Sequence, residues 1–96
     1  MTPAERKALK ARAHKLDPIV TIGGKGLTDS VIAEIDFALA AHELIKVRAG
    51  GMERDQREQA FRLICERTGA QGVQHIGKIF VVYRKKQEDE DGAEVS

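Results

Sequence analysis

The segment best suited to chemistry is a glycine loop, Gly23-Gly24-Lys25-Gly26. It follows a short β-branched run over residues 19–22 and precedes a segment with helical spacing. Glycine permits a sharp turn and the close approach of a ligand, and the free amides of a helix N-terminus attract anions. With Lys25 beside them, these groups suit a phosphate. A GxxG sequence also forms ordinary tight turns, so the loop alone leaves both interpretations open.

No complete enzyme or metal-binding motif accompanies this loop. His42-Glu43 begins a zinc-protease motif, but Lys46 stands where the second histidine is required. The glycine loop satisfies half of the dinucleotide fingerprint, which Asp29 then interrupts. The three histidines, His14, His42 and His75, fall in different predicted elements. We therefore expect no catalytic residue, no metal, no cofactor and no small-molecule substrate.

The single cysteine, Cys65, excludes an internal disulfide framework and a cysteine-rich zinc site. It lies among apolar residues with helical spacing, which indicates a small buried side chain. No apolar run approaches the roughly 20 residues of a membrane span, and the N-terminus lacks the features of a secretory signal. A cytoplasmic location without membrane contact is expected.

Charge is unevenly distributed along the 96 residues. The chain has 16 basic and 15 acidic residues, but five of the acids lie in residues 87–96, which contain no base. Ten acids remain against 16 bases in residues 1–86, a net charge of +6. A basic body with an acidic tail is typical of nucleic-acid binders. We expect one domain over residues 1–86 and a disordered acidic tail over residues 87–96.

Basic residues outside the glycine loop are predicted to extend the same surface. In the first predicted helix, Lys7, Lys10 and His14 form an i, i+3, i+7 row. Others fall near strand ends: Lys46, Arg48, Lys78, Arg84, Lys85 and Lys86. A solvated helix face also explains the row, Lys78 also suits a turn, and Lys46 and Arg48 also suit solvent-facing strand positions.

Periodicity and turn signals predict the elements that position these residues. Thr2-Pro3-Ala4-Glu5 predicts a capped helix start, and Asp17-Pro18 predicts the helix end. The next elements are a strand over residues 19–22, a helix capped by Thr28, a strand over 44–48, a helix from about Asp55 to Arg67, and a hairpin of residues 73–76 and 79–84. A strand-helix-strand unit requires a parallel pair. We predict a two-layer α/β fold, a helix followed by β-α-β-α-β-β, with a mixed four-stranded sheet.

Two stretches of the sequence resemble a known family. Residues 22–28, followed at the expected distance by His42-Glu43-Leu44-Ile45-Lys46-Val47, are similar to the CRM domain (chloroplast RNA splicing and ribosome maturation), in particular to bacterial single-domain YhbY-like proteins. Residues 74–78 and 81–84 also resemble that family. The resemblance covers residues 3 to 85 and leaves out the acidic tail.

The resemblance implies a fold similar to the C-terminal domain of bacterial translation initiation factor three. It also implies an RNA-binding protein associated with precursors of the large ribosomal subunit. The family's loop glycines correspond to Gly23 and Gly26, and its basic loop position corresponds to Lys25. Two features depart from the family pattern: the additional Gly24 inside the loop, and the pair Gly50-Gly51 after the second strand.

We therefore predict a monomeric, non-catalytic protein that binds structured ribosomal RNA as a large-subunit assembly factor. The candidate RNA-binding residues are Gly23, Gly24, Lys25, Gly26, Thr28, Lys7, Lys10, His14, Lys46, Arg84, Lys85 and Lys86. Aromatic residues make up only 4% of the chain, which argues against stacking on single-stranded bases. The alternative function is a protein adaptor whose charged first helix binds a ribosomal protein or factor.

Overall fold

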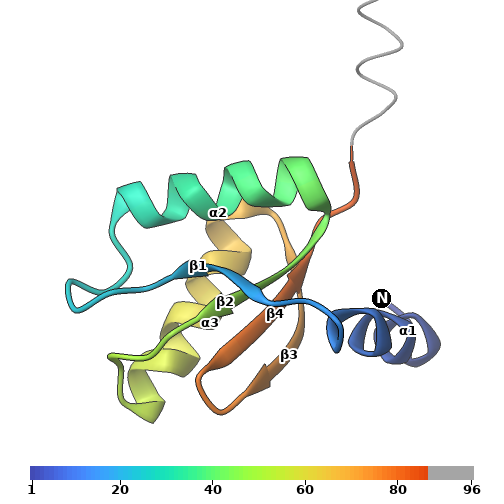
Figure 1. Cartoon of the computed structure of the whole chain (residues 1–96), viewed down its shortest axis with the longest axis horizontal. Coiled ribbons are helices and arrows are strands. Elements are labelled where there is room, and N and C mark those ends of the chain that lie inside the picture. The colour runs from blue at the N-terminus through green and yellow to red at the C-terminus, as the bar shows by residue number, and fades with distance from the viewer. Residues whose placement is uncertain (87–96) are drawn as a thin grey trace, which may run out of the picture.

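Helices and strands alternate along residues 1–86, which are the residues that the computed structural model describes. The elements are α1 (Pro3–Ala13), β1 (Pro18–Thr21), α2 (Asp29–His42), β2 (Leu44–Arg48), α3 (Arg54–Thr68), β3 (Gln71–Ile76) and β4 (Ile79–Tyr83). The predicted α/β fold and the predicted element order are confirmed (Figure 1). The predicted acidic tail, residues 87–96, lies outside the described residues.

The strands form one mixed sheet in the order β1-β2-β4-β3. β1 and β2 are parallel, and β4 is antiparallel to both of its neighbours, as the sequence predicts. Because β1 and β2 are parallel, their carboxyl ends lie at the same edge of the sheet. The loops that lead into α2 and α3 therefore begin at this edge.

Helices α2 and α3 cover one face of the sheet. Their buried side chains, Ile35, Leu39 and Ile64 among them, pack with strand residues that alternate along the chain, including Ile45, Val47 and Phe80. This alternation follows from strand geometry, since successive side chains point to opposite faces. We call this side of the sheet the covered face.

Helix α1 packs on part of the opposite face. Leu9 and Ala13 contact a second apolar cluster formed by Leu44, Val73 and Val81. Arg6 fixes the helix further, because its guanidinium donates hydrogen bonds to the backbone oxygens of Gly72 (2.7 Å) and Val73 (3.1 Å). In Figure 1, α1 lies at one end of the sheet, which leaves the remainder of this face without a helix.

The helix starts largely follow the predicted caps. Thr2 and Glu5 form the predicted capping box of α1, and Thr28 caps α2 by accepting a hydrogen bond from the Val31 N–H (3.2 Å). Helix α1 ends at Ala13, before the end predicted at Asp17-Pro18, because the chain there tightens into turns in which the Lys15 and Leu16 N–H groups donate to residues three positions earlier. Helix α3 begins one residue earlier than predicted, at Arg54. Its start was misplaced because the capping box uses Glu53 and Gln56, and glutamate is not among the residues favoured at this position.

Candidate nucleic-acid interface

The glycine loop is an ordered turn between β1 and α2. The Gly26 N–H donates a hydrogen bond to the Gly23 oxygen (3.0 Å), and the Thr28 N–H donates to the Gly26 oxygen (3.1 Å). Gly26 has a φ of 77°, in the left-handed region that favours glycine. The tight-turn geometry is therefore present. It leaves the amides of Gly24 and Lys25 without a hydrogen-bond partner among residues 1–86.

A hollow of about 360 Å³ lies beside this loop. One wall is the glycine loop, and the other is formed by the start of α3 and the loop before it. The lining outside the glycine loop comprises Leu27, Gly51, Met52, Gln56, Gln59, Ala60 and Leu63. The two loops approach closely, since a Cβ built on Gly51 would lie 3.9 Å from the Gly23 oxygen and from the Gly24 Cα.

Sequence reasoning missed the α3 part of this hollow. Gln56 and Gln59 belong to no motif, and only the fold brings them to the glycine loop. The available signal was Gly50-Gly51, which the sequence marks as unusual. The structure explains its position as a second glycine-containing loop beside the first.

A third segment, the turn between β3 and β4, reaches the same end of the sheet. The Ala49 N–H donates a hydrogen bond to the Lys78 oxygen (2.7 Å), which ties this turn to the loop after β2. Lys25, Arg48 and Lys78 therefore come from three segments at one end of the sheet. All three side chains are exposed.

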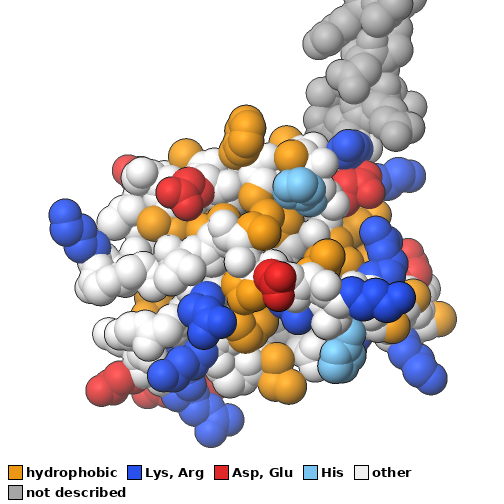
Figure 2. Space-filling model, viewed as in Figure 1, with side chains coloured by type: hydrophobic (Ala, Val, Ile, Leu, Met, Phe, Trp, Pro, Cys, Tyr) orange, Lys and Arg blue, Asp and Glu red, His pale blue; other side chains and the backbone are white. Residues whose placement is uncertain are grey.

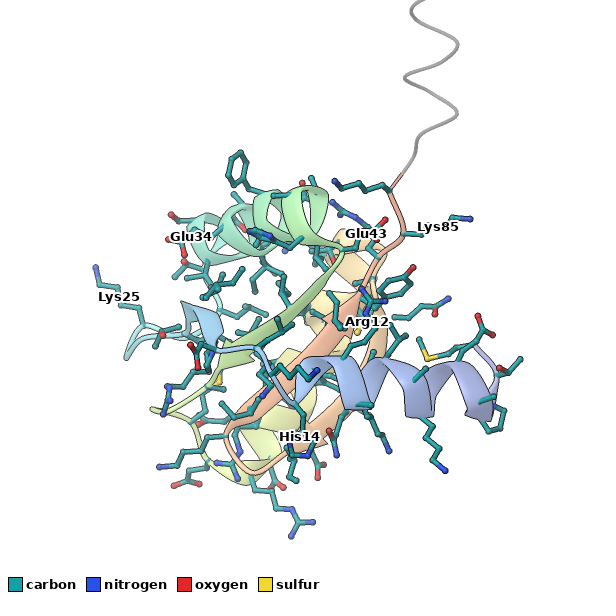
Figure 3. The ribbon with its side chains drawn as sticks, turned by 45° about the vertical axis from the view of Figure 1, so that its right-hand side comes forward. Arg12, His14, Lys25, Glu34, Glu43 and Lys85 are labelled. Carbon is teal, nitrogen blue, oxygen red and sulfur yellow. The ribbon has the colours of Figure 1, made fainter. Side chains whose placement is uncertain are left out.

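The basic row of α1 lies far from this end. Figure 3 shows Lys25 projecting from the glycine loop at one end of the molecule, whereas α1 extends to the opposite end from Arg12 and the C-cap residue His14, which lie nearer the middle. Lys7 and His14 are exposed and Lys10 is half-buried. The structure thus separates Lys7, Lys10 and His14 from the glycine loop. Lys46, half-buried in the middle of β2, lies between the two regions.

The Arg84 side chain forms contacts within the fold. Its guanidinium forms an ion pair with Asp36 of α2 and donates hydrogen bonds to the backbone oxygens of Asp36 (3.0 Å) and Thr68 (2.8 Å). Only 24% of the side chain is exposed. These contacts join the residue after β4 to α2 and α3, so the structure gives Arg84 a structural role and we do not propose it as an RNA contact. Sequence reasoning missed this because Asp36 is 48 residues away.

Three other residues that the sequence predicts to bind RNA are Thr28, Lys85 and Lys86. The Thr28 hydroxyl oxygen accepts the Val31 N–H and so serves as the cap of α2. The Lys86 backbone N–H donates to a Glu43 carboxylate oxygen (2.9 Å), while the Lys85 and Lys86 side chains are exposed. Figure 3 places Lys85 at the end of the molecule away from Lys25.

Cys65 is half-buried rather than fully buried. Burial, with a smaller contribution from the charge of Glu66, raises the pKa of its thiol. Within residues 1–86, no three His, Cys, Asp or Glu side chains are grouped so that they could hold a metal ion. None of the described helices is long and apolar enough to cross a membrane.

These features define an α/β domain with a glycine turn between a strand and a helix and with a second glycine loop beside it. The sequence model of the CRS1 / YhbY (CRM) domain matches residues 1–84. The chain belongs to the CRS1 / YhbY (CRM) domain family. The family resemblance found in the sequence is therefore confirmed.

Individual relatives match nearly the whole chain. An RNA-binding protein of Haemophilus influenzae is 43% identical over 88 residues, which cover 92% of this chain and 89% of that protein. "Probable RNA-binding protein YqeI" of Bacillus subtilis is 36% identical over 90 residues, with 93% of both chains covered. The solution structure of a Staphylococcus aureus protein, described as a candidate RNA-binding protein, matches with a TM-score of 0.80, 33% identity and 95% coverage of both chains.

Proposed function

We propose that this chain binds structured ribosomal RNA through the glycine loop and acts in assembly of the large ribosomal subunit. The relatives named for RNA binding support the RNA partner. One observation carries the assignment of the site. The glycine loop presents free amides and the exposed Lys25 beside a hollow lined by a second glycine loop and by the amide side chain of Gln59.

The proposed mechanism is recognition of the RNA backbone. The amides of Gly24 and Lys25 donate hydrogen bonds to phosphate oxygens, and the Lys25 ammonium neutralises their charge. The positive end of the α2 dipole lies just beyond the loop and favours the same anion. Gln59 is able to hydrogen-bond a ribose hydroxyl or a base edge. Contacts of this kind position RNA more than they read its sequence, and they require no catalytic step.

The adaptor alternative receives less support from the structure. Its proposed binding element, α1, already uses Leu9 and Ala13 to pack against the sheet. The exposed side of α1 carries Lys7 and Arg12 but no large apolar side chain. Protein interfaces usually depend on buried aromatic or other large anchors, which this helix does not offer.

The proposal is tested by placing negative charge in the loop with the variant Gly24→Asp/Lys25→Asp. A Cβ on Gly24 meets no atom within 4 Å, and its φ is not in the left-handed region, so the variant is expected to fold. Its affinity for a transcript of large-subunit ribosomal RNA is expected to fall at least about tenfold. The variant Ala40→Asp/Arg62→Asp changes the net charge equally at exposed positions of α2 and α3 and is the matched control.

Filter binding gives the affinities, and circular dichroism with thermal melting reports folding. If the folded loop variant binds as tightly as the wild type, the glycine loop does not hold RNA. The assembly role needs a separate measurement, sedimentation of a cell lysate. The wild type is expected to migrate with precursors of the large subunit and the loop variant to remain at the top of the gradient. Migration of the wild type with free protein alone would overturn the assembly role.

A further inference from the structure

Part of the sheet is left without a covering helix, on the side to which α1 packs. Along β2, Ile45 and Val47 belong to the covered face, and Leu44 contacts the cluster under α1. Because strand side chains alternate, Lys46 and Arg48 point to the same side as Leu44. Lys46 is half-buried, and Arg48 is exposed. We define the open face as Thr21, Lys46 and Arg48, with Lys78 at its edge.

The strand register places these residues together. Thr21 lies opposite Arg48 in the parallel pair, and Arg48 lies opposite Ile79 in the antiparallel pair. Lys78 immediately precedes Ile79. Its backbone oxygen accepts a hydrogen bond from the N–H of Ala49, the residue after Arg48. Arg48 and Lys78 are therefore neighbours at the end of the sheet that also carries the glycine loop.

The cations of the open face are not used to hold the fold together. Five arginines make contacts within the protein: Arg6, Arg54, Arg57, Arg67 and Arg84. In contrast, no ion pair or side-chain hydrogen bond within residues 1–86 involves Lys46, Arg48 or Lys78. Three unpaired cations on a small surface repel one another, so their arrangement favours a bound anion.

Acidic residues are concentrated on the other side of the sheet. Helices α2 and α3 together contain six acidic and four basic residues. The four strands contain two basic residues, Lys46 and Arg48, and no acidic one. Figure 2 shows Lys and Arg side chains at the lower left, with acidic ones beside them, over the start of α3 and the turn between β3 and β4. Lys and Arg appear again at the right over α1, and an acidic side chain is visible between the two regions. The open face lies between these two basic regions.

The open face, as defined by Thr21, Lys46, Arg48 and Lys78, has no aromatic side chain on which a single-stranded base can stack. Phe61 and Phe80 pack with His75 in one aromatic cluster, with ring centroids 4.8 to 5.6 Å apart. Tyr83 is half-buried in the cluster under α1, and Phe37 projects from α2. Recognition of single-stranded RNA depends on stacking, whereas double-stranded RNA is bound through its phosphates and 2′-hydroxyls.

We propose that Lys46, Arg48 and Lys78 form a second phosphate-binding site, which receives the backbone of double-helical RNA. This inference rests on the proposed function, because it extends the same RNA contact from the glycine loop across the sheet. Lys46 and Arg48 are two residues apart on β2, about 6.7 Å, so they contact neighbouring phosphates. The unpaired Arg12 and Lys15 line a hollow at the α1 end of β1 together with Asp17, so the surface remains net basic in that direction.

The test uses the variant Arg48→Gln/Lys78→Gln, which alters two exposed side chains and is expected to melt like the wild type. The control is Ala40→Asp/Arg62→Gln, which changes the net charge equally at exposed, unpaired positions of α2 and α3. Two probes are used: an RNA hairpin with a fully paired stem, and a poly(U) strand of equal length. For the hairpin, affinity is expected to fall about tenfold and the slope of log affinity against log salt to fall by about 1.4 to 1.8. The wild type is expected to prefer the hairpin.

The outcomes separate the two proposals. If Arg48→Gln/Lys78→Gln binds the hairpin with unchanged affinity and slope while Gly24→Asp/Lys25→Asp loses binding, the proposed function stands and the second site is wrong. If only Arg48→Gln/Lys78→Gln loses binding, the open face is supported and the glycine loop is not the RNA site. Tighter binding of poly(U) than of the hairpin by the wild type would overturn the choice of double-helical RNA.

Discussion

The two faces of the sheet differ in what they contribute, and β2 supplies residues to both. On the covered face, Ile45 and Val47 are almost completely buried beneath α2 and α3. On the other side of the same strand, Lys46 and Arg48 belong to the open face and form no ion pair or side-chain hydrogen bond within residues 1–86. Alternation along one five-residue strand thus separates the residues that stabilise the fold from the residues that we propose to contact RNA. Substitutions on the two faces should therefore have separable effects.

The largest expected effect comes from the covered face. Phe80→Ala removes a side chain with no exposed surface and is expected to destabilise the domain by about 3–5 kcal/mol. Urea denaturation followed by circular dichroism measures this change. Arg48→Gln on the open face is the comparison and is expected to change stability by less than about 0.5 kcal/mol. Equal losses from the two variants would contradict the separation of the faces.

The variant Arg84→Ala tests whether the Arg84 guanidinium stabilises the fold rather than contacting RNA. Removal of the guanidinium leaves the Asp36 carboxylate and the Thr68 oxygen without their partner, so stability is expected to fall by about 1–3 kcal/mol. RNA affinity, measured where the variant is fully folded, is expected to stay the same. Lys85→Ala, which removes the adjacent exposed cation, is the control for stability. Loss of RNA affinity without loss of stability would return Arg84 to the interface.

The alkylation rate of Cys65 measures how far the covered face is protected from solvent. Burial raises the pKa of its thiol, so less thiolate is present near neutral pH than in a free cysteine. Alkylation of the native protein is expected to be about tenfold slower than in urea, and to increase at a higher pH than alkylation of a free cysteine. Mass spectrometry follows the reaction. Equal rates in native and urea-unfolded protein would show that this part of α3 is open to solvent.

The smallest expected effect concerns residues 87–96. Their five acids follow Lys85 and Lys86, so they are able to compete with RNA phosphates at a high effective concentration. Under this gate hypothesis, truncation after Lys86 raises affinity for non-cognate RNA about twofold to threefold at low salt, and the difference shrinks as salt screens the tail. Fluorescence anisotropy measures both proteins. Equal affinities at low ionic strength would leave the tail a solubilising role only.

Local signals predicted most of the fold. The Thr2 to Glu5 capping box, the Thr28 cap and the β-branched strands are determined by neighbouring residues, and the structure contains each of them. The start of α3 was misplaced by one residue because Glu53 is an uncommon cap. The parallel pair followed from the strand-helix-strand order, a general rule of connection.

The candidate site was less predictable because its parts are distant in sequence. The glycine loop could be identified from composition alone. The approach of Gly51 and Gln59 to this loop depends on how α3 packs against α2 and the sheet. The ion pair between Arg84 and Asp36 likewise joins residues that only the fold brings together. Basic residues are recognisable in a sequence, whereas their pairing with acids is a tertiary property. The sequence therefore did not distinguish Arg84 from Arg48.

The central claim, that basic side chains and loop amides hold RNA phosphates, is tested most directly by the salt dependence of binding. Affinity of the full chain for a large-subunit ribosomal RNA transcript is measured from low to physiological salt. If about five phosphates are neutralised, log affinity falls against log salt with a slope of about 3.5 to 4.5 in magnitude. A binding constant that does not change over this range would contradict a mechanism based on phosphate contacts.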